Sequence, residues 1–412
     1  MVKSKKKKEV NANSSRNKKD VVYVMENIKD HDVNIMCKDM ENVNNDVKAT
    51  DNRKILSSRL SRKDIHENNT KLQNDNCLQR KCLILDLNRV IISHQPSSCF
   101  GALTNSQIYG MLNVPELDLI FYIEKEGKLF SSPSDEIERI TENALYWKEE
   151  TDISLKIKGF NYWSGHGNVF FYLINSKSSF DEILIFSWER KHQRFIFSKR
   201  FNIHSLNRIE SILPIDYDRL YLIASFYFEN IHLQKIEIIL RLAWGSIHMY
   251  DGKKSVIVAD RLSMPTSISM DKKKKILYVS ELIGRTVKIY EVKNDLSLNE
   301  ITEINSILTS PSQLYLESSS GDVWITANPF LWKQLTSYFY PIVKETKSKE
   351  SQIIRIRFQG TDQKTWVITE PFAESGINYN NANGVIAIKE TMIVSSPTNG
   401  LLICPQLNMK IL

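Results

Sequence analysis

The sequence predicts an all-β fold: a six-bladed β-propeller with a disordered basic N-terminal tail. From Cys99 onward, short stretches rich in β-branched and aromatic residues recur at the spacing of roughly 8–12 residues typical of all-β domains. Short polar turns join them, which indicates antiparallel meanders rather than βαβ crossovers. The 318 residues from Gln95 to Leu412 divide into six units of about 53, which suits four-stranded blades with long loops.

The predicted strands follow one another along the chain, and no convincing long amphipathic helix separates them. They are Leu117–Ile123, Leu129–Ser131, Asp152–Ile157, Asn168–Asn175, Glu182–Ser187, Phe195–Ser198, Leu206–Leu213, Arg219–Ala224, Ile238–Tyr250, Val256–Ala259, Ser267–Met270, Ile276–Ser280, Thr286–Glu291, two strands within Pro311–Pro329, Ile353–Phe358, Thr365–Ile368, Gly384–Ile388, Met392–Ser396 and Gly400–Cys404. The polar segment Ile342–Ile353 is predicted to be a loop insertion. A β-sandwich of this length would need two domains, and no linker separates two halves.

Residues 1–87 are predicted to be the disordered tail and residues 88–412 the propeller. The first 80 residues contain 13 Asn but no Gly, Pro, Phe or Trp, and their 18 Lys and Arg exceed their 12 Asp and Glu. Such a composition buries too little apolar area to offset its chain entropy. The run Lys5–Lys8 fits either a nuclear-localisation or nucleic-acid signal or a solvated tail; the lack of interleaved aromatic residues favours the solvated tail.

No segment of the sequence predicts insertion into a membrane. No window reaches the roughly 18 apolar residues of a transmembrane helix. The most apolar early segment, Cys82–Ile92, is interrupted by Asp86, Asn88 and Arg89, so it is too short and too charged for a signal-peptide core. If Met1 is the true start, the sequence therefore predicts a cytoplasmic protein without a signal peptide.

Several motifs carry a resemblance to a known family, most clearly after Leu240. They are LRLAWGS (Leu240–Ser246), PTSISMDKKKKILYVSELIGRTVKIYE (Pro265–Glu291), SGDVWITANP (Ser320–Pro329), QIIRI (Gln352–Ile356), GLLIC (Gly400–Cys404) and, upstream, HQPSSC (His94–Cys99). In this order they resemble the paraoxonase/arylesterase family. The resemblance implies a six-bladed propeller, calcium-dependent hydrolysis of lactones and aryl esters, and an extracellular or secretory-pathway location.

The resemblance also implies a disulfide between Cys99 and Cys404, which would join the first strand segment to the last and close the ring. Closing a loop of about 300 residues contributes on the order of 4–5 kcal/mol in the chain-entropy treatment. The alternative is two unrelated buried thiols, and an oxidising compartment favours the disulfide.

In the resembled family, calcium lies in the central tunnel and is held by carboxylates and Asn amides, because a hard cation takes about six or seven oxygen ligands. The family's Glu-Asp pair falls here on Gly110–Met111 or, in a second register, on Tyr109–Gly110, so neither carboxylate is present. Glu116 and Asp118 follow a few residues later and are the only nearby substitutes.

The other calcium positions of the family keep mostly neutral oxygens. The residues that the resemblance assigns to them are Asn207, Thr266, Ser312 and Gln313. Arg208 stands where the family has an anionic ligand of its structural calcium, so its charge opposes ion binding there.

The histidine pair that activates water in the family is also replaced. Trp163 and Ser176 stand at the two positions. His166 is the candidate catalytic base if the loop before it is shortened. We interpret Gly165–Asn168 instead as the hairpin turn between strands 160–164 and 169–175.

These replacements predict a divergent member of the family that has lost the catalytic calcium and acts as a non-catalytic binding module, with a small apolar ester- or lactone-like ligand in the tunnel. The alternative is an active calcium-dependent hydrolase of aryl esters and lactones. No GxSxG, P-loop, HExxH or EF-hand pattern indicates another chemistry.

Overall fold

The structure is a computed structural model that describes residues 99–103, 106–124, 127–146, 155–203, 205–206, 208–305, 307–339, 349–360 and 363–405. All of them belong to one compact unit, residues 81–412. The predicted tail, residues 1–87, and the predicted start of the propeller at residue 88 lie outside the described residues.

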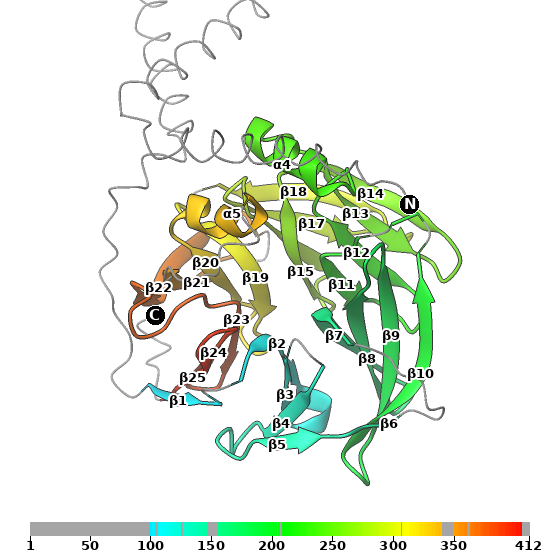
Figure 1. Cartoon of the computed structure of the whole chain (residues 1–412), viewed down its shortest axis with the longest axis vertical. Coiled ribbons are helices and arrows are strands. Elements are labelled where there is room, and N and C mark those ends of the chain that lie inside the picture. Colours follow the sequence, from blue (N-terminus) through cyan, green and yellow to red (C-terminus); the bar gives the residue numbers. More distant parts are fainter. Residues whose placement is uncertain are drawn as a thin grey trace, which may run out of the picture. The chain divides into compact units, whose positions relative to one another are not determined.

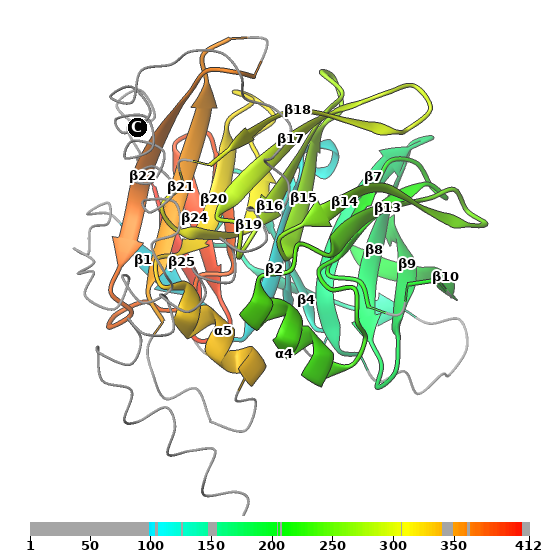
Figure 2. The same cartoon turned by 90° about the horizontal axis from the view of Figure 1, so that it is seen from above.

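Six sheets surround a central axis as blades, which confirms the predicted six-bladed propeller (Figures 1 and 2). Blade 1 contains β2 (Ile108–Val114), β3 (Leu119–Glu124), β4 (Leu129–Pro133) and β5 (Thr141–Asn143). Blade 2 contains β7 (Ile157–Gly165), β8 (Asn168–Ser176), β9 (Asp181–Glu189), β10 (Arg194–Asn202) and the short β6 (Leu145–Tyr146). Blade 3 contains β11 (Ser211–Pro214), β12 (Leu220–Ala224), β13 (Gly245–Tyr250) and β14 (Ser255–Leu262).

The second half of the chain builds three more blades. Blade 4 contains β15 (Pro265–Asp271), β16 (Ile276–Glu281), β17 (Thr286–Val292) and β18 (Leu298–Ile304). Blade 5 contains β19 (Ser310–Leu316), β20 (Val323–Asn328), β21 (Ser351–Phe358) and β22 (Trp366–Glu374). Blade 6 contains β23 (Gly384–Ile388), β24 (Thr391–Ser396), β25 (Gly400–Cys404) and β1 (Phe100–Ala102).

The ring closes in blade 6, where two segments far apart in the sequence meet. The outermost strand, β1, precedes all the others in sequence and pairs antiparallel with β25, with Phe100 opposite Ile403. Directly beside this pairing, Cys99 and Cys404 form the predicted disulfide across a sequence separation of 305 residues. Both strand pairing and a covalent bond therefore hold the two ends of the propeller together.

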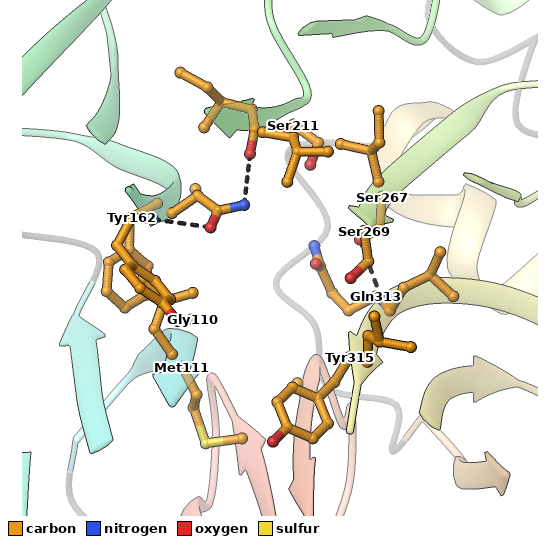
Figure 3. A pocket seen from close by; sticks show the side chains of 18 of the residues that line it. Gly110, Met111, Tyr162, Ser211, Ser267, Ser269, Gln313 and Tyr315 are labelled. Carbon is orange, nitrogen blue, oxygen red and sulfur yellow. Dashed lines mark hydrogen bonds between the residues drawn. The ribbon is translucent and has the colours of Figure 1, made fainter. Parts of the chain in front are cut away.

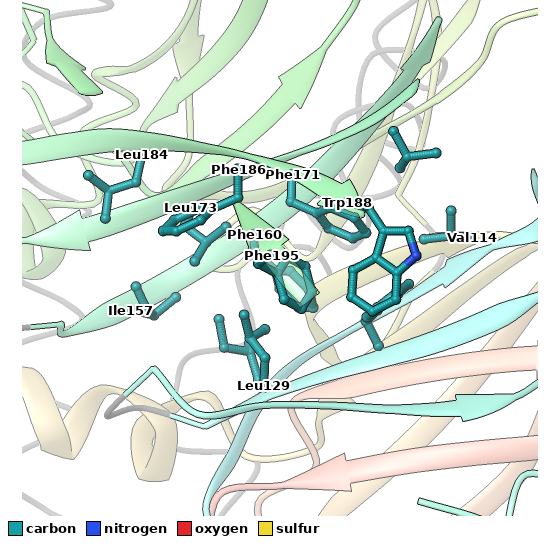
Figure 4. Packing of buried hydrophobic residues seen from close by; sticks show 13 residues of the cluster. Val114, Leu129, Ile157, Phe160, Phe171, Leu173, Leu184, Phe186, Trp188 and Phe195 are labelled. Atoms are coloured by element: carbon teal, nitrogen blue, oxygen red, sulfur yellow. The ribbon is translucent and has the colours of Figure 1, made fainter. Parts of the chain in front are cut away.

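The core consists of apolar layers between neighbouring blades. Between blades 1 and 2 the buried rings of Phe121, Phe171, Trp188 and Phe195 pack edge to face, with centroids 4.8–5.6 Å apart in five of the pairs (Figure 4). Aromatic pairs in this geometry are worth about 0.5–1.5 kcal/mol beyond the area that they bury. Because successive side chains of a strand point to opposite faces of its sheet, one strand contributes side chains to two interfaces between blades.

The two described helices, α4 (Ile231–Leu240) and α5 (Leu331–Phe339), were not predicted. In α4 the usual pattern is inverted: Gln234 and Glu237 are buried, because they bond to the preceding loop, whereas Ile236 and Ile239 are exposed. The predicted strand Ile238–Tyr250 is therefore wrong in its first residues, which end α4. No helix in the described part of the chain is long and apolar enough to cross a membrane.

The predicted loop Ile342–Ile353 is wrong at its end, because Ser351–Phe358 form β21. Residues 342–348 lie outside the described part of the chain.

A buried ion pair in blade 5 explains two of the sequence motifs. Asp322, of SGDVWITANP, accepts a hydrogen bond from the Arg355 Nε at 2.7 Å, and Arg355 is only 1% exposed. The guanidinium lies 5.1 Å from the Trp324 ring centroid, and the Trp324 indole donates to Glu317. The motif therefore holds one buried cation between a carboxylate and an aromatic face.

We expect Asp322→Asn to lower the free energy of unfolding by about 3 kcal/mol, because it leaves the buried Arg355 without its counter-ion. The matched control is Asp218→Asn, which breaks an exposed pair with Lys199 and should cost less than about 1 kcal/mol. Urea unfolding of both variants measures the difference. Equal losses of unfolding free energy would show that the buried Asp322–Arg355 pair stabilises the fold no more than the exposed pair does.

Candidate functional site

A cavity of about 210 Å³ lies where the innermost strands of all six blades meet (Figure 3). The first strand of each blade is the innermost, and each contacts the first strand of the next blade around the ring. The cavity lining is Tyr109–Asn113, Lys158–Tyr162, Glu210–Leu213, Ser267–Met270, Lys272, Gln313–Leu316, Ser318 and Asn383–Val385. The cavity is therefore the central tunnel of the propeller, and its wall combines aromatic, amide and hydroxyl groups with the charged side chains of Lys158, Glu210 and Lys272.

The wall contributed by blade 1 is closed to larger side chains. A Cβ atom on Gly110 would lie 3.0 Å from Cε1 of the Phe160 ring and 3.3 Å from Cγ2 of Ile123. Gly110 is one of the positions where the resembled family has a carboxylate. In this chain Phe160 from blade 2 packs against the glycine, so a longer side chain at 110 would require Phe160 to move.

Amide side chains link the inner strands across the tunnel wall. Asn161 donates to the carbonyl oxygen of Ile212 and accepts from the amide of Tyr162, both at 2.8 Å, so both ends of its amide are used. Asn113 donates to the Tyr315 hydroxyl at 3.2 Å, and its Oδ1 has no hydrogen-bond partner among the described residues. A buried acceptor without a partner is unfavourable, because it has lost its hydrogen bonds to water.

The tyrosines of the wall remain neutral hydrogen-bond donors. Burial raises the pKa of Tyr315 to about 12, although the hydrogen bond from Asn113 opposes the rise. Burial, with the nearby Glu116 carboxylate, also raises the pKa of Tyr162 well above its usual value. The Glu116 carboxylate accepts a solvent-exposed hydrogen bond of 2.6 Å from the Ser164 hydroxyl, near the end of β7.

Two of the four residues that the resemblance assigns to calcium positions, Thr266 and Ser312, lie in the junction between blades 4 and 5. The Thr266 hydroxyl donates to the carbonyl oxygen of Ser312 at 2.8 Å, and the Ser312 hydroxyl donates to the carbonyl oxygen of Thr326 at 3.0 Å. Neither side chain lines the cavity, whereas Gln313 does, and Figure 3 shows its amide extending toward the middle. Asn207 lies outside the described residues.

His166 lies at the exposed tip of the β7–β8 hairpin, with φ of 53°, and is not among the residues that line the cavity. The predicted hairpin turn at Gly165–Asn168 is confirmed. Trp163, at the position of the family's histidine, is buried and stacked against Phe170 at 5.9 Å. The catalytic role predicted for His166 remains a hypothesis that this location does not support.

Among the described residues, no three His, Cys, Asp or Glu side chains are arranged to hold a metal ion. The carboxylate that does line the cavity is Glu210, just before β11. Burial raises its pKa, and the nearby Asp181 carboxylate adds to this, whereas Lys158 opposes it. One carboxylate whose charge is disfavoured by its surroundings is a poor basis for a calcium site, which needs several anionic oxygens.

Sequence reasoning missed Glu210, Lys158 and Asn161 as cavity residues. The signal for Asn161 was present, because it follows Phe160 in the segment matched to the family's histidine motif. The histidine position in this segment is occupied by Trp163, and Asn161 lies two residues before it. Glu210 follows Arg208 by two residues, but the direction of its side chain depends on where β11 begins, and the predicted strand began five residues too early.

The geometry thus defines a class of protein: a disulfide-closed six-bladed propeller with a ligand-sized central cavity. Comparison with known proteins makes this specific, since the family model described as Arylesterase matches residues 105–405. The chain belongs to the arylesterase family.

Individual relatives show how divergent the chain is. It is 29% identical to mechanosensory abnormality protein 6 of Caenorhabditis elegans over 79% of this chain and 91% of that protein. It is 19% identical to human serum paraoxonase/arylesterase 1, over 60% of this chain and 67% of that protein. The match to rabbit serum paraoxonase/lactonase 3 is 24% identical but spans only 45% of that protein.

The raised pKa of Glu210 predicts a pH-dependent effect of Glu210→Gln. The folded state favours the protonated acid, so ionisation destabilises the wild-type protein as pH rises above the unfolded-state pKa of about 4.3. We expect the variant to match the wild type near pH 4 and to melt at a higher temperature at pH 7.

The control for this comparison is Glu390→Gln, in the exposed turn between β23 and β24. It should leave the melting temperature unchanged at both pH values. A Glu210→Gln variant that is less stable than wild type at pH 7 would contradict the assignment, because it would mean that the ionised carboxylate is stabilised by its neighbours.

Proposed function

We propose that this protein is a non-catalytic binding module of the arylesterase family that holds a small, weakly polar molecule in its central tunnel without a catalytic calcium ion. The observation that carries the proposal is that the side chains at the family's calcium positions mostly contact other protein groups and do not line the cavity. The Thr266 hydroxyl bonds to blade 5 at the carbonyl oxygen of Ser312, and the Ser312 hydroxyl bonds to Thr326 within blade 5. Phe160 covers Gly110. Gln313 is then the one described position that offers the cavity an oxygen.

Ligand charge supports the same conclusion. Calcium affinity follows the number of anionic oxygens over orders of magnitude, and the residual positions supply neutral oxygens only. Without the ion, a bound ester would have neither its carbonyl polarised nor its developing oxyanion stabilised. The wall would therefore bind such a molecule and leave it intact.

The lining indicates the class of ligand. Phe160, Tyr162 and Tyr315 supply apolar surface, whereas Asn113 and Gln313 supply separate hydrogen-bonding groups. This combination suits a compact molecule with an apolar body and one or two polar atoms. The names of the human and rabbit relatives refer to arylesterase and lactonase activity, so we propose a lactone or ester as the ligand.

The disulfide supports a location for this function. Cys99–Cys404 closes the ring, and such bonds persist in oxidising compartments. We therefore propose that the protein works in the secretory pathway or outside the cell.

One pair of measurements on the full-length chain separates the binding module from the hydrolase. We expect the same melting temperature in millimolar calcium and in chelator, and no turnover of aryl esters or lactones in the same samples. Calcium-dependent turnover accompanied by a rise of several degrees would establish the hydrolase instead. Human serum paraoxonase/arylesterase 1, assayed in parallel, would verify that the substrates are suitable.

The ligand itself is tested by titration with a panel of lactones of increasing ring and chain size, followed by calorimetry. We expect Gln313→Ala to weaken binding about 2- to 10-fold, the loss of one neutral hydrogen bond. Gln359→Ala, on an exposed residue after β21, is the matched control and should bind as wild type. Equal affinities of the two variants would place the ligand outside the tunnel.

A further inference from the structure

The guanidinium of Arg208 is surrounded by oxygen atoms at the junction of blades 2 and 3. Arg208 lies in the connection between β10 and β11, and its partners lie at the end of β8, in the β8–β9 turn and at the start of β9. These are the Ser176 hydroxyl at 3.4 Å, the carbonyl oxygens of Lys177 at 3.1 Å and Ser178 at 2.8 Å, and Asp181 Oδ1 at 3.3 Å. Four acceptors from one turn thus meet one cation.

A second cation completes the arrangement from the opposite direction. Lys158, on β7, lies 3.1 Å from Asp181 Oδ2 and 3.1 Å from the carbonyl oxygen of Ile209. The amide of Ile209 also donates to Asp181 Oδ2 at 2.8 Å. The Asp181 side chain is fully buried and therefore bridges both cations and the backbone that enters blade 3.

We name these six oxygen atoms the Asp181 cage. They are Ser176 Oγ, the carbonyl oxygens of Lys177, Ser178 and Ile209, and the two carboxylate oxygens of Asp181. Carbonyl, hydroxyl and carboxylate oxygens in this number are the ligands that Ca²⁺ takes in proteins. In this chain they bond to ammonium and guanidinium N–H groups instead.

We propose that Arg208 and Lys158 fill the Asp181 cage as cations fixed to the chain, so that the junction of blades 2 and 3 is held without a divalent ion. The guanidinium suits this role because its donors are directional and permanently charged. A fixed cation, unlike a bound ion, holds the junction at any calcium concentration. The proposal rests on these contacts and is independent of whether the tunnel binds a ligand.

Two substitutions at one position test the proposal in the full-length protein. Arg208→Gln removes the charge, so we expect the melting temperature to fall on the order of 5 °C and calcium not to restore it. Arg208→Asp replaces the cation with a second carboxylate in the cage. We expect it to melt lower still in chelator and to regain several degrees in millimolar calcium.

The matched control is Arg200→Gln, an exposed arginine on β10, which should change the melting temperature by less than about 1 °C. A loss for Arg208→Gln no greater than that of Arg200→Gln would overturn the proposal. So would an Arg208→Asp protein that calcium does not stabilise, since the cage would then lack the geometry that we assign to it. Calorimetric titration of calcium into Arg208→Asp at low temperature measures binding directly.

The comparison also separates this proposal from the proposed function. Calcium binding in the tunnel would stabilise the wild type and all three variants by a similar amount. Calcium binding in the cage would stabilise Arg208→Asp and leave Arg200→Gln unchanged. If calcium raised the melting temperature of every protein equally, the calcium-free tunnel would be contradicted. The Asp181 cage would then be supported only by an additional rise in Arg208→Asp.

Discussion

The structure depends on the closure of the ring between β1 and β25. A ring of six blades encloses a tunnel only if the last blade is joined to the first, and here a strand of three residues completes it. So short a strand contributes few hydrogen bonds, and the Cys99–Cys404 disulfide keeps it next to its partner. Closing the ring brings the inner strands of blades 6 and 1, β23 and β2, into contact beside the cavity that all six inner strands line.

The strands that could be predicted from the sequence are those with a clear local pattern of apolar residues. In blade 4, β16 is buried along its whole length, β17 is buried at most of its positions, and a short turn joins them, so both were predicted almost to the residue. The innermost strand β2 was missed, because Gly110 and Asn113 interrupt its pattern. Those residues face the tunnel, where cavity shape rather than core packing sets the side chains.

The candidate site was harder to predict because it is assembled from strands that are far apart in sequence. The sequence identified Thr266 and Ser312 as positions of interest, but not that the Thr266 hydroxyl bonds from blade 4 to blade 5 or that the Ser312 hydroxyl bonds to Thr326 within blade 5. A one-residue change in register directs a side chain to the opposite face of a strand. Resemblance therefore located the ring of candidate residues, whereas only the structure distinguished Gln313 in the cavity from its neighbour in the wall.

The buried charges of blades 2 and 3 are balanced by cations of the chain itself. An anionic side chain near the axis needs a cation, and that cation is either bound from solution or supplied by the chain. Asp181 is buried and bonded to Lys158 and Arg208. Burial raises the pKa of Glu210, and the nearby Lys158 only partly offsets this rise. Supplying the cations from within the sequence fixes the strand ends permanently, but it also removes the exchangeable charge with which a bound metal polarises a substrate. Under the function that we propose, a family member built in this way would keep the scaffold and the cavity without the electrostatic basis for ester hydrolysis.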